Sequence, residues 1–193
     1  MLTFQQPVSE EFVRSLKCGD SLLYNGVLYT ARDAAHKYFA SGANPVPGLD
    51  LQGGLIYHCG PVTVKTADGW AVTAAGPTTS IREEPYMGTL IRRFGLRGII
   101  GKGGMGEGTA QACRDCGCVY LHAVGGAARL LARCVESVLD VFYYEEFGAP
   151  EAIWKLQVKD FPVIVTMDST GRSLHQEVLQ TSRRQFEALV PSR

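Results

Sequence analysis

Hydrophobic and polar positions along this chain follow two periods, which predict strands and helices interleaved along most of its length. Apolar residues alternate with polar ones, or form short apolar runs, in the segments expected to be strands: 2–5, 21–24, 27–30, 55–58, 62–66, 70–75, 99–100, 119–124, 135–144, 153–158 and 161–167. Apolar residues recur every three or four positions in the segments expected to be helices: 9–16, 32–40, 83–94, 106–116, 127–132 and 173–189. Ser9 is the expected N-cap of the first helix.

Turn signals divide these segments. Asn25-Gly26 and Asp68-Gly69 each lie between two β-favouring runs, and both dipeptides are typical of tight β-hairpins. The segment 42–54 is rich in Gly and Pro and is expected to be a long loop that could serve as a flap.

The order of the elements predicts an α/β fold with mixed sheets and flanking helices. The first half is rich in strands, whereas the second half contains two strand-turn-helix units in succession, which favour parallel strands joined by right-handed crossovers. At 193 residues the chain is long enough for one domain with a buried core, and we expect residues 1–193 to form a single domain that ends in an amphipathic helix.

Charge and hydropathy exclude two classes of partner. Lys and Arg total 19, as do Asp and Glu, so the chain lacks the basic excess that non-specific nucleic-acid binding requires. No apolar run approaches the roughly 18 residues of a membrane span, and the first residues do not resemble a signal peptide. We therefore expect no nucleic-acid partner, no membrane contact and a cytoplasmic location.

Cysteine spacing leaves two interpretations open. Cys113, Cys116 and Cys118 lie close together in the sequence, as metal ligands often do. Cys18, Cys59 and Cys134 provide no second pair, so the set does not match an ordinary four-ligand zinc site. Buried, reduced thiols are the favoured reading, and no metal ligand is assigned to the chain.

The clearest candidate site is formed by two polar, glycine-rich turns that follow predicted strands, a position where α/β proteins commonly bind ligands. The first turn contributes the hydroxyls of Thr78, Thr79 and Ser80 and the guanidinium of Arg82. The second turn surrounds Lys102 with Gly101, Gly103 and Gly104, which let a ligand approach the backbone. These residue types predict a site for a small anion.

Arg32 and His36 are further candidates because they lie four residues apart at the start of a predicted helix. An isolated surface ion pair is the plainer interpretation of Arg32, and an ordinary helix-face histidine is that of His36. With Arg82, Arg32 could bind a dicarboxylate bidentately, while Lys102 adds charge and Thr78 places a hydroxyl at the reacting carbon. The glycine-rich turn lacks the Walker pattern, and neither a dinucleotide fingerprint nor a serine-hydrolase elbow is present.

Three ordered motifs resemble a known family. They are Arg32-Asp33-Ala34-Ala35-His36, Gly76-Pro77-Thr78-Thr79-Ser80-x-Arg82 and Gly101-Lys102-Gly103-Gly104-Met105-Gly106. Together they are similar to the β subunit of the iron–sulfur hydro-lyases, the family of class I fumarase and L-tartrate dehydratase. Single-chain members carry this region as a C-terminal domain.

The resemblance implies a swivelling β/α/β domain like the mobile domain of aconitase. It also implies an α-subunit partner, in an α2β2-type assembly, that holds a 4Fe-4S cluster whose open iron acts as a Lewis acid. Arg32, Arg82 and Lys102 match residues that bind substrate carboxylates, and Thr78 matches a threonine proposed to move a proton together with an α-subunit Asp. Thr79, Gly101 and Gly103 are expected to line the same site, with His36 as a secondary catalytic candidate.

One position departs from the commonest family pattern. Glu83 stands where a Met is frequent, before the acidic Glu84, and we interpret this change as bearing on substrate choice. The leading hypothesis is a fumarate hydratase β subunit, and the alternative within the class is an L(+)-tartrate dehydratase β subunit. The alternative from another class is a non-catalytic module that binds a small acid.

Overall fold

A computed structural model describes residues 2–190 of the chain. The strands are β1 (Leu2–Gln5), β2 (Ser21–Thr30), β3 (Leu55–Tyr57), β4 (Val62–Thr66), β5 (Gly69–Ala74), β6 (Gly98–Gly101), β7 (Val119–His122), β8 (Val135–Phe142) and β9 (Ile153–Met167). The helices are α1 (Glu10–Ser15), α2 (Asp33–Ala40), the 3-10 turn η1 (Ser80–Glu83), α3 (Glu84–Phe94), α4 (Glu107–Cys116), α5 (Ala128–Ala132), α6 (Tyr144–Phe147) and α7 (Leu174–Leu189).

Within these residues, seven strands form one mixed sheet in the order β1-β2-β3-β6-β7-β9-β8, and β4 pairs with β5 in a separate hairpin. β2, β3, β6 and β7 are parallel to one another, and β9 runs antiparallel to β7. β9 also pairs with β2 along most of its length, so the hydrogen-bonded ring β2-β3-β6-β7-β9 closes on itself. The mixed α/β class predicted from the sequence is confirmed.

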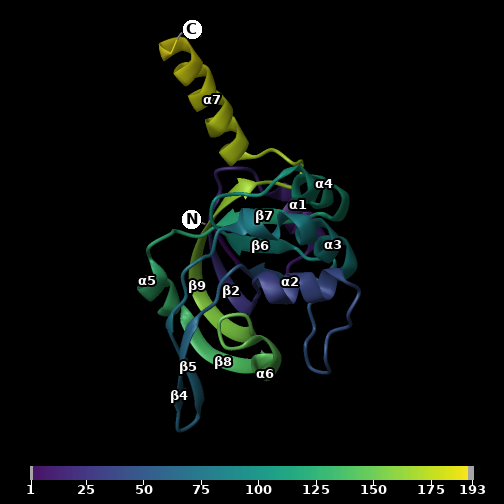
Figure 1. Cartoon of the computed structure of the whole chain (residues 1–193), viewed down its shortest axis with the longest axis vertical. Helices are drawn as coiled ribbons and strands as arrows, with labels where there is room; N and C mark the ends of the chain where they lie inside the picture. Colours follow the sequence, from purple (N-terminus) through teal and green to yellow (C-terminus); the bar gives the residue numbers. More distant parts are fainter. Residues whose placement is uncertain (1, 191–193) are drawn as a thin grey trace.

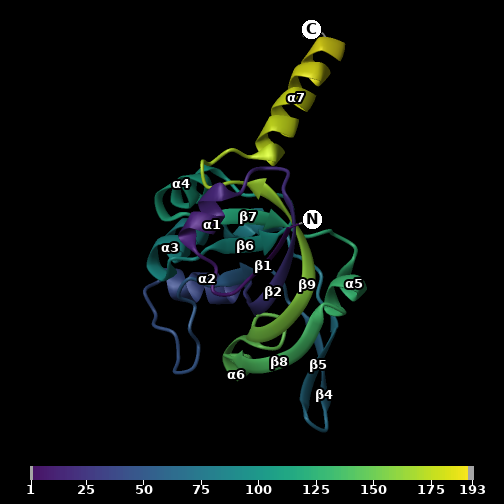
Figure 2. The same cartoon turned by 180° about the vertical axis from the view of Figure 1, so that it is seen from behind.

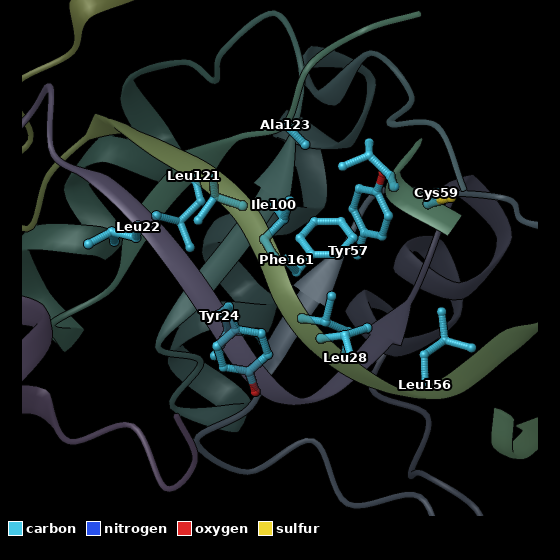
Figure 3. Close-up of a cluster of buried hydrophobic side chains, with 14 of the residues drawn as sticks. Leu22, Tyr24, Leu28, Tyr57, Cys59, Ile100, Leu121, Ala123, Leu156 and Phe161 are labelled. Atoms are coloured by element: carbon cyan, nitrogen blue, oxygen red, sulfur yellow. The ribbon is translucent and has the colours of Figure 1, made fainter. Parts of the chain in front are cut away.

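The interior of this ring is the first of two hydrophobic clusters. Alternate residues of each strand point inward because side chains in a strand alternate between faces. Figure 3 shows Leu28 of β2, Tyr57 of β3, Ile100 of β6, Leu121 of β7 and Phe161 of β9 converging there. The rings of Tyr57 and Phe161 meet edge to face, with centroids 5.3 Å apart.

The second cluster lies between the outer face of the parallel strands and the helices α2, α3 and α4 (Figure 1). Ile56 of β3 and Ile99 of β6 face the apolar side of α3, which contributes Met87, Leu90 and Ile91. The central strands are therefore buried on both faces, as their nearly continuous apolar runs indicate.

Two details of the sequence-based topology are wrong. No hairpin forms at Asn25-Gly26, because β2 continues through these residues with an irregularity between Tyr24 and Gly26 and remains paired with β9. Likewise, 153–158 and 161–167 form one strand, β9, in which Asp160 has a φ of 51°. The hairpin at Asp68-Gly69 is confirmed, since Thr66 pairs with Gly69 between β4 and β5.

The last helix, α7, projects away from the body of the protein in both Figure 1 and Figure 2. The predicted terminal helix is thus present, with Ser173 as its N-cap. Most of its apolar residues are exposed, including Val178, Leu179 and Phe186, whereas Leu174 is half-buried. Within the part of the chain that the structure describes, no helix combines the length and apolarity that crossing a bilayer would need.

Candidate functional site

The candidate residues gather where three neighbouring parallel strands end. Arg32 follows β2, His58 follows β3 and Lys102 follows β6. Thr78 and Arg82 belong to the connection between β5 and α3, and hydrogen bonds join that connection to the ends of β3 and β6. The carboxyl ends of parallel strands are the usual ligand-binding edge of an α/β sheet. The motifs that are far apart in the sequence therefore meet at one edge.

The backbone on both sides of Thr78 is fixed by these strand ends. The Thr78 amide donates to the His58 carbonyl at 2.7 Å, and the Thr78 hydroxyl donates to the same oxygen at 3.1 Å. Thr79 forms a parallel β-bridge with Lys102, and the Ser80 amide donates to the Lys102 carbonyl at 2.9 Å. The two glycine-rich turns predicted to flank the site are thus joined directly to each other.

Glycine is required at position 101 for steric reasons. A Cβ atom on Gly101 would overlap the Ser80 hydroxyl and would lie 3.1 Å from the Tyr120 hydroxyl and 3.2 Å from Nδ1 of His58. Gly103 has a φ of 83°, a conformation that L-residues rarely adopt. Gly101 and Gly103 therefore shape the backbone that carries Lys102.

We expect Gly101→Ala to destabilise the chain by about 1–3 kcal/mol, because the added methyl must displace buried polar groups. Gly125→Ala is a suitable control, since its Cβ would make an ordinary contact with Lys102 Cδ at 3.4 Å. Urea denaturation of both variants measures the difference. Equal stability of the two variants would contradict the steric argument.

Each candidate arginine is held by a carboxylate. Arg82 forms an ion pair with Asp33 at the start of α2, and the Arg32 Nε atom lies 3.3 Å from Oε1 of Glu151. The Arg82 side chain is 51% exposed and that of Arg32 is 23% exposed, so both retain surface that a ligand could contact. The other oxygen of Glu151 accepts from the Ala34 amide at 3.0 Å, which fixes it at the N-terminus of α2.

Lys102 has a different environment from the arginines. Its side chain is half-buried and lies against Gly125, and none of the ion pairs found among residues 2–190 includes it. Its ammonium charge is consequently the least compensated of the three candidate cations.

Behind the arginines lies a buried pair, His36 and Glu83. The His36 ring is fully buried, and its Nδ1 atom donates to the Arg32 carbonyl at 2.8 Å and lies 3.5 Å from Oε2 of Glu83. Burial lowers the pKa of His36 to about 4. Burial, reinforced by the charge of Asp33, raises the pKa of Glu83 to about 7.

The raised pKa of Glu83 predicts a pH-dependent stability. Because the folded chain binds this proton more tightly than the unfolded chain, Glu83 favours folding most below pH 4.5, and this contribution is lost as pH rises through 7. Glu83→Gln should therefore raise the free energy of unfolding at pH 8 by about 1–3 kcal/mol and flatten its pH dependence between pH 4.5 and 8. Denaturant titrations at several pH values measure both effects.

Glu84→Gln is the matched control for that experiment. The Glu84 carboxylate accepts hydrogen bonds from the Gly106 amide at 2.7 Å and the Thr109 amide at 3.1 Å, at the N-terminus of α4. Since a negative charge is favourable there, Glu84→Gln should destabilise the protein at pH 8, opposite in sign to Glu83→Gln. Stabilisation by both substitutions would show that general charge reduction, not burial of Glu83, governs the result.

These contacts give the acidic pair after Arg82 distinct structural positions. Glu84 caps α4, and the side chain of Glu83 points inward, where it is only 2% exposed. An influence of Glu83 on substrate choice stays a prediction, and from this position it would act through His36 and the neighbouring arginines rather than by direct contact from the surface.

The cysteine side chains do not form a metal-binding group. Cys113 and Cys118 are buried and Cys116 is half-buried, and all three are free thiols. Within residues 2–190, no three His, Cys, Asp or Glu side chains come together in a way that could hold a metal ion. The donor set described for this chain therefore does not fit an iron–sulfur cluster.

Sequence reasoning missed three residues that organise the site. The sequence predicts His58 only as the last residue of a strand, although its carbonyl holds Thr78. Asp33, which the plainer interpretation would pair with Arg32, pairs with Arg82 instead, and Glu151 pairs with Arg32; the sequence predicts neither contact. Asp33 lies inside the motif Arg32-Asp33-Ala34-Ala35-His36, which indicates that it is near the site, whereas Glu151 lies far away in the sequence and has no such signal.

Comparison with known proteins assigns the chain to a family. The family model described as "Fumarase C-terminus" matches residues 1–178. A putative class I fumarate hydratase of Geobacillus stearothermophilus is 54% identical over 183 residues, which are 94% of this chain and 35% of that protein. This chain thus spans about a third of the length of that relative.

Two further relatives are similar over most of their own length. A putative L(+)-tartrate dehydratase subunit beta of Methanocaldococcus jannaschii is 41% identical over 186 residues, covering 95% of each chain. The L(+)-tartrate dehydratase subunit beta of Escherichia coli K12 is 36% identical over 172 residues, which are 89% of this chain and 85% of that one. Because the family model matches most of the chain and these relatives are similar over most of their length, the chain belongs to the fumarase C-terminus family.

Proposed function

We propose that this chain is the β subunit of a two-subunit hydro-lyase that adds water reversibly to fumarate to give (S)-malate. The observation that carries the proposal is the bridge between the Thr78 and Lys102 turns at the strand edge where Arg32 also lies. This arrangement supports a site for a small molecule with two carboxylates. The similarity to a putative class I fumarate hydratase supports the choice of fumarate.

The cationic residues are proposed to bind the substrate carboxylates. Arg32 and Arg82 have planar guanidinium groups that suit bidentate contacts with carboxylates, and Lys102 supplies a compact positive charge. Asp33 and Glu151 hold the two arginines in place before substrate binds. A dicarboxylate would then meet cations whose orientation is already fixed, which lowers the entropy lost on binding.

Thr78 is proposed to act at the carbon next to a substrate carboxylate. Its hydroxyl hydrogen is donated to the His58 carbonyl, so the oxygen lone pairs remain available to accept from the substrate. A threonine is a weak base without help, and an Asp of the α subunit is the proposed partner in moving the proton. Thr79, Gly101 and Gly103 line the same turns, and His36 is a secondary candidate placed behind Arg32.

The complete enzyme is proposed to require an α subunit. Two relatives are named as beta subunits, which supports a partner subunit, and we place the 4Fe-4S cluster there, as the resemblance to the iron–sulfur hydro-lyases implies. We further propose that this domain swivels, as the mobile domain of aconitase does. The proposed assembly is α2β2, and the proposed location is the cytoplasm. The exposed apolar residues of α7 are compatible with association, since exposed apolar groups often mark contact surfaces.

L(+)-tartrate dehydration to oxaloacetate is the second candidate. The observation that favours it is the match to tartrate dehydratase β subunits over 95% and 85% of their length. L-Tartrate and malate both present two carboxylates and a hydroxyl that can leave, so the same cations could hold either substrate.

Co-expression with the α subunit, followed by anaerobic assay with malate, fumarate and L-tartrate, tests the proposal. Turnover of malate and fumarate with little turnover of L-tartrate is expected. Preference for L-tartrate would select the second candidate. Binding of these acids without turnover would favour a non-catalytic acid-binding module and would overturn both enzymatic assignments.

A further inference from the structure

A chain of three buried polar side chains lies directly beneath the proposed site. The Tyr120 hydroxyl of β7 donates to the Ser80 hydroxyl at 2.8 Å, and the Ser80 hydroxyl lies 2.9 Å from Nδ1 of His58. Each of the three residues is 0% exposed. Since buried polar groups are costly unless paired, these hydrogen bonds favour one arrangement of the three side chains.

The protons of this chain of hydrogen bonds can be placed in one consistent direction. Burial raises the pKa of Tyr120, so its hydroxyl remains a donor, and Ser80 accepts from it. Burial, together with the neighbouring His36 ring, holds the pKa of His58 well below its usual value. With Ser80 accepting from Tyr120, the neutral His58 ring can accept the Ser80 hydroxyl hydrogen at Nδ1. The ring proton is then on Nε2, which is buried and has no hydrogen-bond partner among the described residues.

The same three residues are connected to both substrate-binding turns. The His58 carbonyl accepts from the amide and from the hydroxyl of Thr78. The Ser80 amide donates to the Lys102 carbonyl at 2.9 Å. Gly101 leaves the space that the Ser80 hydroxyl occupies. A shift of the Ser80 side chain would consequently be transmitted to Thr78 through His58 and to the backbone of Lys102.

We propose that Tyr120, Ser80 and His58 are positioning residues that hold the Thr78 hydroxyl at the reacting carbon of the bound substrate. They do not touch the substrate themselves, because all three are buried behind the turns. The inference rests on the proposed function and deepens it, since it names the residues of this chain that orient its catalytic hydroxyl.

Tyr120→Phe tests the proposal with the loss of a single oxygen atom. Measured on the αβ complex with whichever of malate or L-tartrate the wild type turns over, kcat should fall about tenfold, because small misplacements of reacting groups are costly. KM should stay within about twofold, since the charges of Arg32, Arg82 and Lys102 are unchanged.

Tyr24→Phe is the matched control. Tyr24 is also fully buried, and its hydroxyl makes one hydrogen bond, to the Val27 carbonyl at 2.9 Å within β2. Both substitutions should lower Tm by similar amounts, because each removes one buried hydrogen bond. Only Tyr120→Phe should lower kcat, which separates positioning from general stability.

Ser80→Ala and the double variant Ser80→Ala/Tyr120→Phe complete the test. Because Tyr120 acts through Ser80, the double variant should have the same kcat as Ser80→Ala alone, whereas independent structural effects would multiply. An active wild-type complex in which Tyr120→Phe keeps its kcat, or loses it no more than Tyr24→Phe, would overturn the positioning role alone. A wild-type complex that turns over neither substrate would overturn the proposed function and this role with it.

Discussion

Replacing Lys102 with alanine is expected to reduce kcat/KM of the assembled complex by an amount that corresponds to about 2–5 kcal/mol of transition-state binding. Lys102 is the candidate cation without an ion-pair partner among the described residues, so a bound carboxylate would be its main compensating charge. Arg82 and Arg32 already share their charges with Asp33 and Glu151. Loss of Lys102 should therefore cost more than the loss of an exposed, paired arginine.

Steady-state kinetics measure kcat/KM of Lys102→Ala, with Lys65→Ala as the control. Lys65 lies on the separate β4–β5 hairpin, over the ring of Trp70 at 5.3 Å, and removing its charge should leave kcat/KM within about twofold. Lys102→Gln should resemble Lys102→Ala, because charge rather than bulk is required. Unchanged kinetics for both Lys102 variants would show that Lys102 does not bind the substrate and would remove it from the proposed site.

The local elements of the fold were predictable because their signals are local. α3 occupies most of the predicted segment 83–94, with Pro85 in its first turn and Gly95 in the left-handed conformation at its end, as the sequence indicates. The alternation of Ile99 and Ile100 between two clusters likewise follows from strand geometry.

The errors arose where long-range pairing determines the backbone. Asn-Gly favours a two-residue hairpin only when the flanking runs pair with each other. Here both runs pair with β9, more than a hundred residues away, and Gly26 adopts a φ of 143° within a continuous strand. No feature of residues 21–30 reveals that partner.

The candidate site likewise has a part that the sequence predicts and a part that it does not. The motifs around Thr78, Arg82 and Lys102 could be found from residue types and from glycine spacing, and the structure brings their elements to one strand edge. The groups that hold these residues in place could not be predicted from the sequence, because a backbone carbonyl such as that of His58 has no sequence signature. A carboxylate such as Glu151 is one acidic residue among many until the fold places it beside Arg32.

The second large effect is expected for Thr78→Val, which removes the hydroxyl while keeping the shape of the side chain. The amide of residue 78 can still donate to the His58 carbonyl at 2.7 Å, so the turn should keep its path and lose only the contact made by the hydroxyl at 3.1 Å. The stability cost should be about 0.5–1.5 kcal/mol. The chemical cost should be much larger: kcat should fall by a factor of about 10²–10⁴, the range for a positioned proton-transfer group.

Thr78→Ser and Thr79→Val distinguish the hydroxyl of residue 78 from the general polarity of the turn. Thr78→Ser keeps a hydroxyl at the same position and should retain most of kcat. Thr79 is exposed and joins Lys102 through a β-bridge of the backbone. As a proposed substrate-binding residue it should affect KM, whereas Thr79→Val should change kcat less than about threefold because the hydroxyl of residue 78 is kept. Rates measured with saturating substrate isolate this effect from binding. If Thr78→Val kept the wild-type kcat in an active complex, the proton transferred in the reaction would have to be handled by another group, and Thr78 would be left with a role in shaping the turn.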